Sequence, residues 1–361
     1  MTTDARLFQP LPLRGLTLEN RIVVSPMCQY SATDGSACDW HVVNLGQFAL
    51  GGPGIVFFEA THVSPEGRIT DRCLGLYGDE NEAGMERVVR FVRQWSRAPI
   101  GVQLAHAGRK ASTLPPWEGG GPARGDRAWE PVAPSALAYA PDWHVPRALD
   151  EAGLEKVRAD FVAAARRCER LGIDAIELHF AHGYLAHQFL SPIANARTDA
   201  YGGTLENRMR FPLELFDAVR AVWPERKPLG VRISATDHVA GGWDLEGSLE
   251  LAARLRDRGC DFIDVSSGGL SPEQRIDAVP GYQVPYARAI KRATGMPTIA
   301  VGLITSPAQA EAILEDGSAD AVALARGFLR DPRWAWDAAD ELGGEAFCPP
   351  QYARGRSARR P

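Results

Sequence analysis

Two histidines and a tyrosine in the middle of the chain have the residue types and the spacing for acid–base chemistry. His179 and His182 stand three residues apart, directly after an apolar run, and Tyr184 follows two residues later. Two imidazoles at this spacing could bind a metal, but no third ligand and no glutamate of a His-Glu-x-x-His motif accompanies them. As neutral N–H donors they could instead hold a carbonyl oxygen and stabilise negative charge that develops on it. A phenol with an ordinary pKa of about 10 is protonated at neutral pH, so Tyr184 could supply a proton beside them.

Eight short apolar runs alternate with amphipathic helical segments, and these elements must position the polar side chains. The runs are continuous, which is typical of parallel strands covered on both faces. Eight such strands with helices between them predict a closed (β/α)8 TIM barrel, an α/β fold. The rival is an open doubly wound sheet, which normally carries Gly-x-Gly-x-x-Gly after an early strand, whereas Gly51-Gly52-Pro53-Gly54 precedes its strand here. We expect strands at Ile22–Val24, Ile55–Phe58, Ile100–Leu104, Ala175–Leu178, Leu229–Ile233, Phe262–Val265, Thr298–Val301 and Ala321–Leu324, and helices that include Leu154–Leu171, Leu205–Trp223, Leu245–Arg258 and Pro307–Glu315.

Residues 1–361 are predicted to form a single domain in which three segments lie outside the minimal barrel. Residues 1–20 precede the first strand and are expected to form a lid over the barrel bottom. Residues 107–150 follow the third strand and are rich in Gly, Pro and Trp; a loop this long is usually functional or flexible, and its aromatics favour an ordered excursion beside the active-site face. Residues 345–361 form a C-terminal tail. Pro212 is expected to kink its helix or to separate the first turns from the rest.

Polar and small residues gather at the carboxyl ends of the predicted strands, which is the active-site face of such barrels. They include no pair of carboxylates placed as in glycosidases, and no lysine in the middle of a strand for a Schiff base. Hydrogen-bond donors, an arginine and small residues dominate, a set that suits a planar polar cofactor with a phosphate. The groups are Ser25-Pro26-Met27-Cys28, Glu59-Ala60-Thr61, Gln103 to His106, Glu177 to His182, Arg232 to Ser234, Ser266-Ser267, Gly302-Leu303 and Ala325-Arg326.

Several sequence motifs resemble those of the old yellow enzyme family. They are SPMCQY at 25–30, EATHVSPEGR at 59–68, QLAHAGRKA at 103–111, ELHFAHGYLAHQFLSP at 177–192, NARTDAYGGTLENR at 195–208, VRIS at 231–234, VGLITS at 301–306 and QYARG at 351–355. They span almost the whole chain in the family's order. The cysteine after Pro-Met and the QYARG tail resemble the bacterial, thermostable-type branch of these ene-reductases. The resemblance implies an FMN-dependent enzyme that takes electrons from NADPH, or from NADH, by ping-pong kinetics.

The resemblance also implies roles for the residues around the histidine pair. His179 and His182 would hold the oxygen of an α,β-unsaturated aldehyde, ketone, imide or nitroalkene while hydride passes from flavin N5 to the β-carbon, and Tyr184 would protonate the α-carbon. Tyr30 would contact substrate. Arg354 would enter the active site of a neighbouring subunit, which makes the working unit a homodimer or a homotetramer.

A further set of residues would hold the flavin if the resemblance holds. Gln103 offers a donor and an acceptor to the pyrimidine edge, Arg232 a cation to the reduced flavin, and Cys28 tunes the redox potential without a covalent role. Relatives usually have Gly where this chain has Ala325; a methyl is tolerable there if φ is negative and unfavourable if φ is positive. The predicted cofactor-binding residues are Ser25, Pro26, Met27, Cys28, Ala60, Gln103, Arg232, Gly302, Ala325 and Arg326, with the phosphate on the loops after strands seven and eight.

Composition and termini narrow the remaining functions. The formal net charge of −5 provides no basic field for nucleic acid, and the six cysteines form no Cys-x-x-Cys pair for zinc or an iron–sulfur cluster. The N-terminus lacks a signal-peptide pattern and no run suits a membrane span, so we expect a cytoplasmic enzyme without metal, membrane or nucleic-acid partners. Three rivals stay open: a dienoyl-CoA reductase-like barrel, which normally has a cysteine cluster and extra domains, a metal-dependent hydrolase, and a non-catalytic flavin-binding or scaffold protein.

Overall fold

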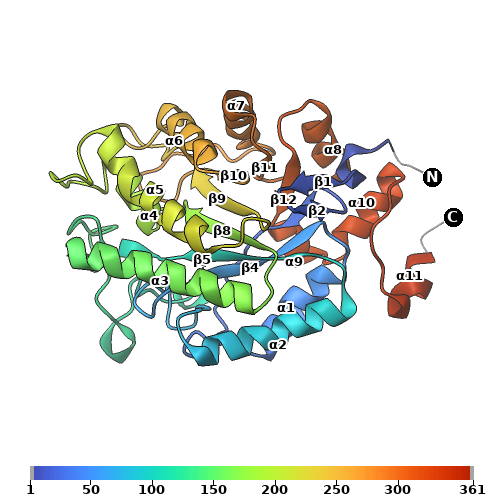
Figure 1. Ribbon diagram of the computed structural model, residues 1–361, viewed down its shortest axis with the longest axis horizontal. Coiled ribbons are helices and arrows are strands. Elements are labelled where there is room, and N and C mark those ends of the chain that lie inside the picture. Colours follow the sequence, from blue (N-terminus) through green and yellow to red (C-terminus); the bar gives the residue numbers. More distant parts are fainter. Residues whose placement is uncertain (1–3, 358–361) are drawn as a thin grey trace.

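A computed structural model describes residues 4–357, and at its centre lies a closed barrel of parallel strands surrounded by helices (Figure 1). All eight strands predicted from the apolar runs are present, and the predicted α/β barrel is confirmed. The first strand of the barrel, β3, closes it by pairing in parallel with the last strand, β12. In chain order the barrel strands are β3 (Ile22–Val24), β4 (Ile55–His62), β5 (Ile100–Ala105), β8 (Ala175–Phe180), β9 (Leu229–Ser234), β10 (Phe262–Ser266), β11 (Thr298–Ala300) and β12 (Ala321–Leu324).

The helices cover the outside of the barrel, and side-chain caps begin several of them. Asp150, Thr204, Asp244 and Ser306 each accept the backbone N–H three residues ahead, which satisfies a donor that the first turn leaves unpaired. Pro212 does not separate the first turns of its helix from the rest, since the helix continues through this buried residue as one element. The helices are α1 (Asp39–Ala49), α2 (Asp79–Trp95), α3 (Glu151–Arg170), α4 (Leu185–Leu190), α5 (Leu205–Val222), α6 (Leu245–Asp257), α7 (Val284–Thr294), α8 (Pro307–Glu315), α9 (Arg326–Arg330), α10 (Trp334–Leu342) and α11 (Ala353–Ser357).

The barrel interior is apolar at the amino ends of the strands. Phe57 and Phe262 fill it, and both need a glycine on a neighbouring strand: a Cβ at Gly101 would lie 2.3 Å from the Phe57 ring, and one at Gly230 would lie 2.3 Å from the Phe262 ring. An antiparallel hairpin, β1 (Leu11–Leu13) and β2 (Leu16–Leu18), packs against this end. The hairpin belongs to the segment expected as a lid, of which residues 1–3 lie outside the described residues. The polar side chains that could carry chemistry therefore lie at the opposite end of the barrel, where the strands have their carboxyl ends.

The segment from 107 to 150 is an ordered excursion of short elements. It contains three 3-10 helices, η2 (Gly108–Lys110), η3 (Pro116–Glu118) and η4 (Gly125–Arg127), and a small parallel pair, β6 (Val132–Ala133) and β7 (Arg147–Ala148). Its first turn is tied to the loop after β10, because Arg109 donates to the Leu270 carbonyl at 3.0 Å. No helix within residues 4–357 has both the length and the apolar character that a membrane crossing requires.

Candidate active site

The histidine pair lies where β8 passes into α4, and its two rings are in edge-to-face contact with centroids 5.1 Å apart. The Nδ1 atom of His179 accepts the Ala181 N–H at 3.3 Å, so the ring proton is assigned to Nε2, which lies 3.3 Å from Nδ1 of His182. His182 then carries its proton on Nε2, 2.8 Å from the Ser266 hydroxyl. Burial, followed by the positive charges nearby, lowers the pKa of both rings well below the ordinary value. Both imidazoles are therefore neutral donors at neutral pH.

The hydrogen-bond chain gives the pair a different arrangement from the one expected for a shared carbonyl. The Nε2–H of His179 points to Nδ1 of His182, and the Nε2–H of His182 points to the Ser266 hydroxyl. For one oxygen to receive both N–H groups, the His182 ring has to leave Ser266 and the His179 N–H has to leave Nδ1 of His182. Within residues 4–357 no third His, Cys, Asp or Glu groups with the pair as a metal site would require.

Tyr184 lies against the same pair, with its ring centroid 4.9 Å from that of His179. Burial raises the pKa of its phenol well above the ordinary value, so the hydroxyl stays protonated through the neutral and mildly alkaline range. The ammonium of the half-buried Lys110 lies 5.3 Å from the ring and donates to the carbonyls of His182, at 2.9 Å, and Gly269, at 2.8 Å. Burial and the neighbouring Arg109 lower the pKa of Lys110 to about 8. The excursion thus fixes the loop that carries His182 and Tyr184.

Cys28 and Tyr30 come from the loop after β3 and meet Tyr184 at a small apolar cluster formed by Ile69, Cys73, Ala107 and Ala111. Burial, with the nearby Cys73 and Glu59, raises the pKa of the Cys28 thiol, so it is not poised as a nucleophilic thiolate. Tyr30 has φ of +50°, and its ring packs edge-to-face on Trp117 of the excursion at 5.6 Å. The backbone N–H of Gln29, between the two residues, donates to the Glu59 carboxylate at 2.9 Å. Ser25, at the start of this loop, has a buried hydroxyl without a partner in the described chain, and Pro26 and Met27 are half-buried beside it.

Ala60 and Gln103 stand opposite each other on β4 and β5, where a β-bulge shifts the register. The side chain of Gln103 is buried and donates to the Glu177 carboxyl at 2.7 Å. Arg232 faces Asp264 on the adjacent strand, with Nε 3.4 Å from Oδ2. These contacts make a charged layer across the barrel, directly above the apolar bottom.

The charged layer holds two carboxyl groups and one guanidinium. Burial raises the pKa of both Glu177 and Asp264, and the nearby Asp264 carboxyl raises the pKa of Glu177 further. The Arg232 guanidinium partly offsets both shifts. Oε2 of Glu177 and both oxygens of Asp264 lack a hydrogen-bond partner in the described residues. One cation cannot neutralise two buried carboxylates, and burial with the nearby Asp264 raises the pKa of Glu177 to about 8. We therefore expect Glu177 to hold a proton at neutral pH.

A cavity of about 330 Å³ opens beside His182 between the loops that follow β10, β11 and β12. The guanidinium groups of Arg232 and Arg326 line it, and no carboxylate of the described chain does. Gly302 has φ of +114°, which a side chain rarely adopts, whereas Ala325 has φ of −105° and its methyl is therefore tolerable. The three residues predicted for a phosphate, Gly302, Ala325 and Arg326, thus meet at one cationic cavity.

The C-terminal tail is anchored to α10 away from the histidine pair. Arg356 donates to the Trp336 carbonyl at 2.9 Å and pairs with Asp340 at 2.6 Å, and the Tyr352 ring packs on Trp336 at 6.0 Å. Arg354 is exposed in α11. Its expected role in the active site of a neighbouring subunit stays a prediction, and residues 358–361 lie outside the described part.

Sequence reasoning placed Glu177 among the polar strand ends but gave it no role, and it missed Asp264. Both acids interrupt an apolar strand, and this pattern could have revealed the buried charged layer. Lys110 and the pair formed by His187 and Asp237 left no such signal, because their contacts depend on loops that come together only in the folded barrel.

The closed barrel carries neutral donors beside a cationic cavity at the carboxyl ends of its strands, and comparisons with known proteins identify the class of protein to which it belongs. A model of the NADH:flavin oxidoreductase / NADH oxidase family matches residues 6–344. The NADPH dehydrogenase of Geobacillus thermodenitrificans (strain NG80-2) is 46% identical over 351 residues, covering 97% of this chain and 98% of that protein. The NADPH dehydrogenase of Bacillus subtilis (strain 168) is 42% identical over 352 residues, covering 97% and 99%. Morphinone reductase superposes with a TM-score of 0.77 at 31% identity, covering 96% of this chain and 92% of that one.

The chain belongs to the NADH:flavin oxidoreductase / NADH oxidase family, which is the old yellow enzyme family. It is an enzyme, an NAD(P)H-dependent flavin oxidoreductase of the NADPH dehydrogenase type.

Proposed function

We propose that this enzyme reduces the C=C bond of α,β-unsaturated aldehydes, ketones, imides or nitroalkenes, with FMN as its flavin and NADPH, or NADH, as the reductant. The observation that carries the proposal is the convergence of three groups at the carboxyl end of β8. Two neutral imidazoles, His179 and His182, lie next to a phenol, Tyr184, that stays protonated. Such a group of neutral donors suits a substrate whose oxygen gains charge and whose carbon takes up a proton.

FMN fits the residues around this point. Gly302, Ala325 and Arg326 line the cationic cavity that would take its phosphate, and Arg232, at the edge of the same cavity, would offer its cation to the reduced ring. The unpartnered Ser25 hydroxyl, in the loop after β3, offers a further hydrogen bond. Ala60 and Gln103 lie side by side on neighbouring strands and would meet the ring system. Cys28 would lie near its reactive edge, as a neutral thiol. When bound, FMN supplies the hydride that it has received from NADPH.

The protein's own groups provide the remaining chemistry. The substrate oxygen receives hydrogen bonds from His179 and His182, and His182 exchanges its contact with Ser266 for one with substrate. These donors stabilise the negative charge that reaches the oxygen when hydride adds to the β-carbon. Tyr184 transfers its hydroxyl proton to the α-carbon and recovers a proton from solvent. The net reaction consumes one NADPH, one proton and one alkene, and it yields NADP⁺ and the saturated product.

Spectroscopy of the purified protein tests the proposal. The expected preparation is yellow, releases FMN on denaturation, is bleached by NADPH without oxygen, and regains its colour when 2-cyclohexenone is added, with cyclohexanone as the product. A protein that stays colourless after incubation with FMN would overturn the cofactor assignment. A reduced flavin that cyclohexenone does not reoxidise would overturn the substrate class.

We further propose a homodimer or homotetramer in which Arg354 and Tyr30 contact substrate from adjoining chains. The exposed position of Arg354 and the substrate-side position of Tyr30 support this arrangement. Light scattering should give a multiple of the 39.2 kDa chain, and Arg354→Ala should raise KM for cyclohexenone without loss of FMN. A monomer with full activity contradicts the shared site.

A further inference from the structure

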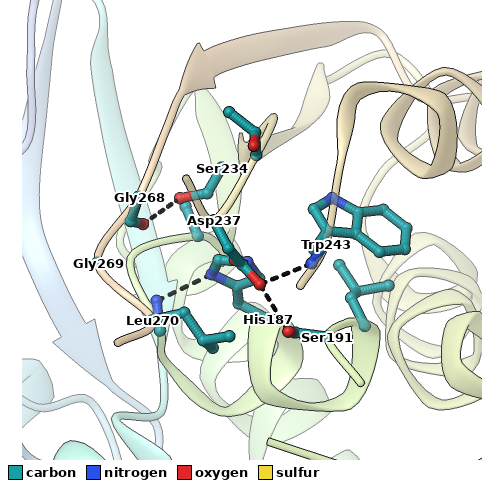
Figure 2. Close-up of polar contacts among 12 residues, drawn as sticks. His187, Ser191, Ser234, Asp237, Trp243, Gly268, Gly269 and Leu270 are labelled. Atoms are coloured by element: carbon teal, nitrogen blue, oxygen red, sulfur yellow. Dashed lines mark hydrogen bonds and ion pairs between the residues drawn. The ribbon is translucent and has the colours of Figure 1, made fainter. Parts of the chain in front are cut away.

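Figure 2 shows a buried histidine–aspartate pair, His187 and Asp237. The histidine is hydrogen-bonded to the backbone of Gly183, which stands between His182 and Tyr184 in the chain. His187, in α4, and Asp237, in the loop after β9, are both fully buried, and Nε2 of the histidine lies 2.9 Å from Oδ1 of the aspartate. Within residues 4–357 no hydrogen bond joins this pair to the side chain of His179, His182 or Tyr184. Its position, one helical turn beyond Tyr184, suggests a role that acts through the backbone.

Asp237 is held rigidly at its other oxygen. Oδ2 accepts the Ser191 hydroxyl at 2.6 Å and the Trp243 backbone N–H at 2.7 Å, and Figure 2 shows both bonds converging on the carboxylate. Gly242 packs against the same side chain, where an added Cβ would lie 2.6 Å from Oδ2. The carboxylate is therefore a fixed point against which the His187 ring is set.

The opposite edge of the His187 ring supports the turn itself. Nδ1 accepts the backbone N–H of Gly183 at 2.9 Å, so the ring proton is assigned to Nε2, the atom that lies 2.9 Å from Oδ1 of Asp237. His182, with φ of +57°, and Gly183, with φ of +72°, form two consecutive residues in the left-handed region, which is unfavourable for His182. A buried N–H that lost its acceptor here would also be costly, since water cannot reach it.

The turn has no freedom to find another acceptor without moving. A Cβ on Gly183 would lie 2.3 Å from the Gly269 carbonyl, so the backbone of the two loops is in direct contact. The His182 N–H is already used by Ser234 at 2.9 Å, and the Gly183 carbonyl by Gln188 at 2.7 Å. Any shift of the Gly183 amide therefore moves the two residues that flank it.

We propose that His187, oriented by Asp237, is a positioning residue for alkene reduction: its Nδ1 atom holds the Gly183 amide and thereby sets the carbonyl grip of His182 and the proton delivery of Tyr184. The proposal rests on the proposed function, because it assigns the consequence of the turn's geometry to that reaction. This role differs from one that only stabilises the fold. It depends on Nδ1 as the acceptor for the Gly183 N–H, and not on the contact between Nε2 and Asp237.

Two amide substitutions separate the two edges of the ring. In His187→Asn the side-chain oxygen lies near the place of Nδ1 and can accept the Gly183 N–H, whereas the contact with Asp237 is lost. In His187→Gln the side-chain nitrogen lies near the place of Nε2 and keeps that contact, whereas the acceptor for Gly183 is lost. Asn195→Ala is the matched control, because Asn195 is buried nearby and donates to the carbonyls of Phe189 and Tyr201 but not to the turn.

The measurements are reoxidation of the NADPH-reduced enzyme by cyclohexenone, reoxidation by oxygen, and backbone amide exchange of residues 181–187. Oxygen needs neither a carbonyl grip nor a placed phenol, so its rate reports on general damage. We expect His187→Gln to lower the cyclohexenone rate about tenfold or more, to change the oxygen rate less than about twofold, and to speed exchange in the turn. His187→Asn should lower the melting temperature yet keep the cyclohexenone rate within about threefold of wild type.

Other outcomes count against the proposal in distinguishable ways. Equal cyclohexenone rates in the Gln and Asn variants, or a loss in Asn alone, would overturn the role of Nδ1. A fall in both rates, or the same selective loss in Asn195→Ala, would show a purely structural effect. A wild-type enzyme that cyclohexenone does not reoxidise would refute the proposed function instead, while the exchange data would still report whether His187 holds the turn.

Discussion

Glu177 is buried in the centre of the barrel and is expected to hold a proton at neutral pH, so replacing it gives a prediction with a defined sign. Glu177→Gln keeps an oxygen for the Gln103 side chain and removes an ionisable group whose Oε2 atom has no partner. Burial and the neighbouring Asp264 raise the pKa of Glu177 in the folded protein above its value in the unfolded chain. As pH rises above about 4.5, the unfolded chain loses this proton and the folded protein retains it, so wild-type stability falls with pH.

The magnitude follows from the proton balance. Each pH unit over which the two states differ by one proton changes the free energy of unfolding by about 1.4 kcal/mol. Between pH 5 and pH 7 the wild type should therefore lose up to about 3 kcal/mol that the variant keeps. Glu177→Gln should be close to wild type in stability at pH 5 and clearly more stable at pH 7.

Urea unfolding of the two proteins at pH 5, 6 and 7 measures this difference. Glu311→Gln serves as a matched control, because the two oxygens of Glu311 accept the backbone N–H groups of Arg6 and Leu7 and an amide cannot replace both. The control should be destabilised at every pH. A Glu177→Gln variant with the same stability difference at all three pH values, or with a difference that shrinks toward pH 7, would refute a protonated Glu177.

Three further predictions concern the cavity, the core and the histidine pair. Ala325→Gly should leave the Kd for FMN within about twofold, because Ala325 has a negative φ and glycine relieves no strain there; titration of the protein stripped of flavin measures it. Burial lowers the pKa of His62 to about 3, so as pH falls below 6.5 the unfolded chain binds a proton before the folded protein does. Between pH 7 and pH 5 the free energy of unfolding should therefore fall by about 2 kcal/mol in the wild type but not in His62→Leu, as acid unfolding curves would show. The double variant His179→Ala/His182→Ala should bind p-hydroxybenzaldehyde at least about tenfold more weakly, measured by the change in flavin absorbance, and unchanged binding would reject the carbonyl grip.

The fold was predictable because parallel strands that are buried on both faces have continuous apolar runs in their sequence. The strand ends were less predictable, since two strands run beyond their predicted ends. β4 ends at His62 and not at Phe58, and β8 ends at Phe180 and not at Leu178, because the backbone there still pairs with the neighbouring strands. Side-chain caps such as Thr204 were visible in the sequence because they act on residues only three positions away.

The site was predictable where it follows strand ends and unpredictable where it depends on contacts between loops. His179, His182 and Tyr184 were found by spacing within one segment, and the structure brings Cys28 and Tyr30 to the same place. The direction of the His182 ring toward Ser266 could not be foreseen, since it depends on a strand 84 residues away. The same holds for His187 and Asp237, whose pairing has no local pattern.

The most direct test of the proposed chemistry is the rate at which 2-cyclohexenone reoxidises the reduced Tyr184→Phe variant under anaerobic stopped-flow conditions. Bleaching by NADPH should remain within about threefold of wild type, since it needs no proton from the phenol, while reoxidation should slow by about 100-fold or more. Because the Tyr184 pKa is raised, the wild-type reoxidation rate should also stay level through mildly alkaline pH. A Tyr184→Phe enzyme that cyclohexenone reoxidises nearly as fast as wild type would contradict the assignment of Tyr184 as the proton donor.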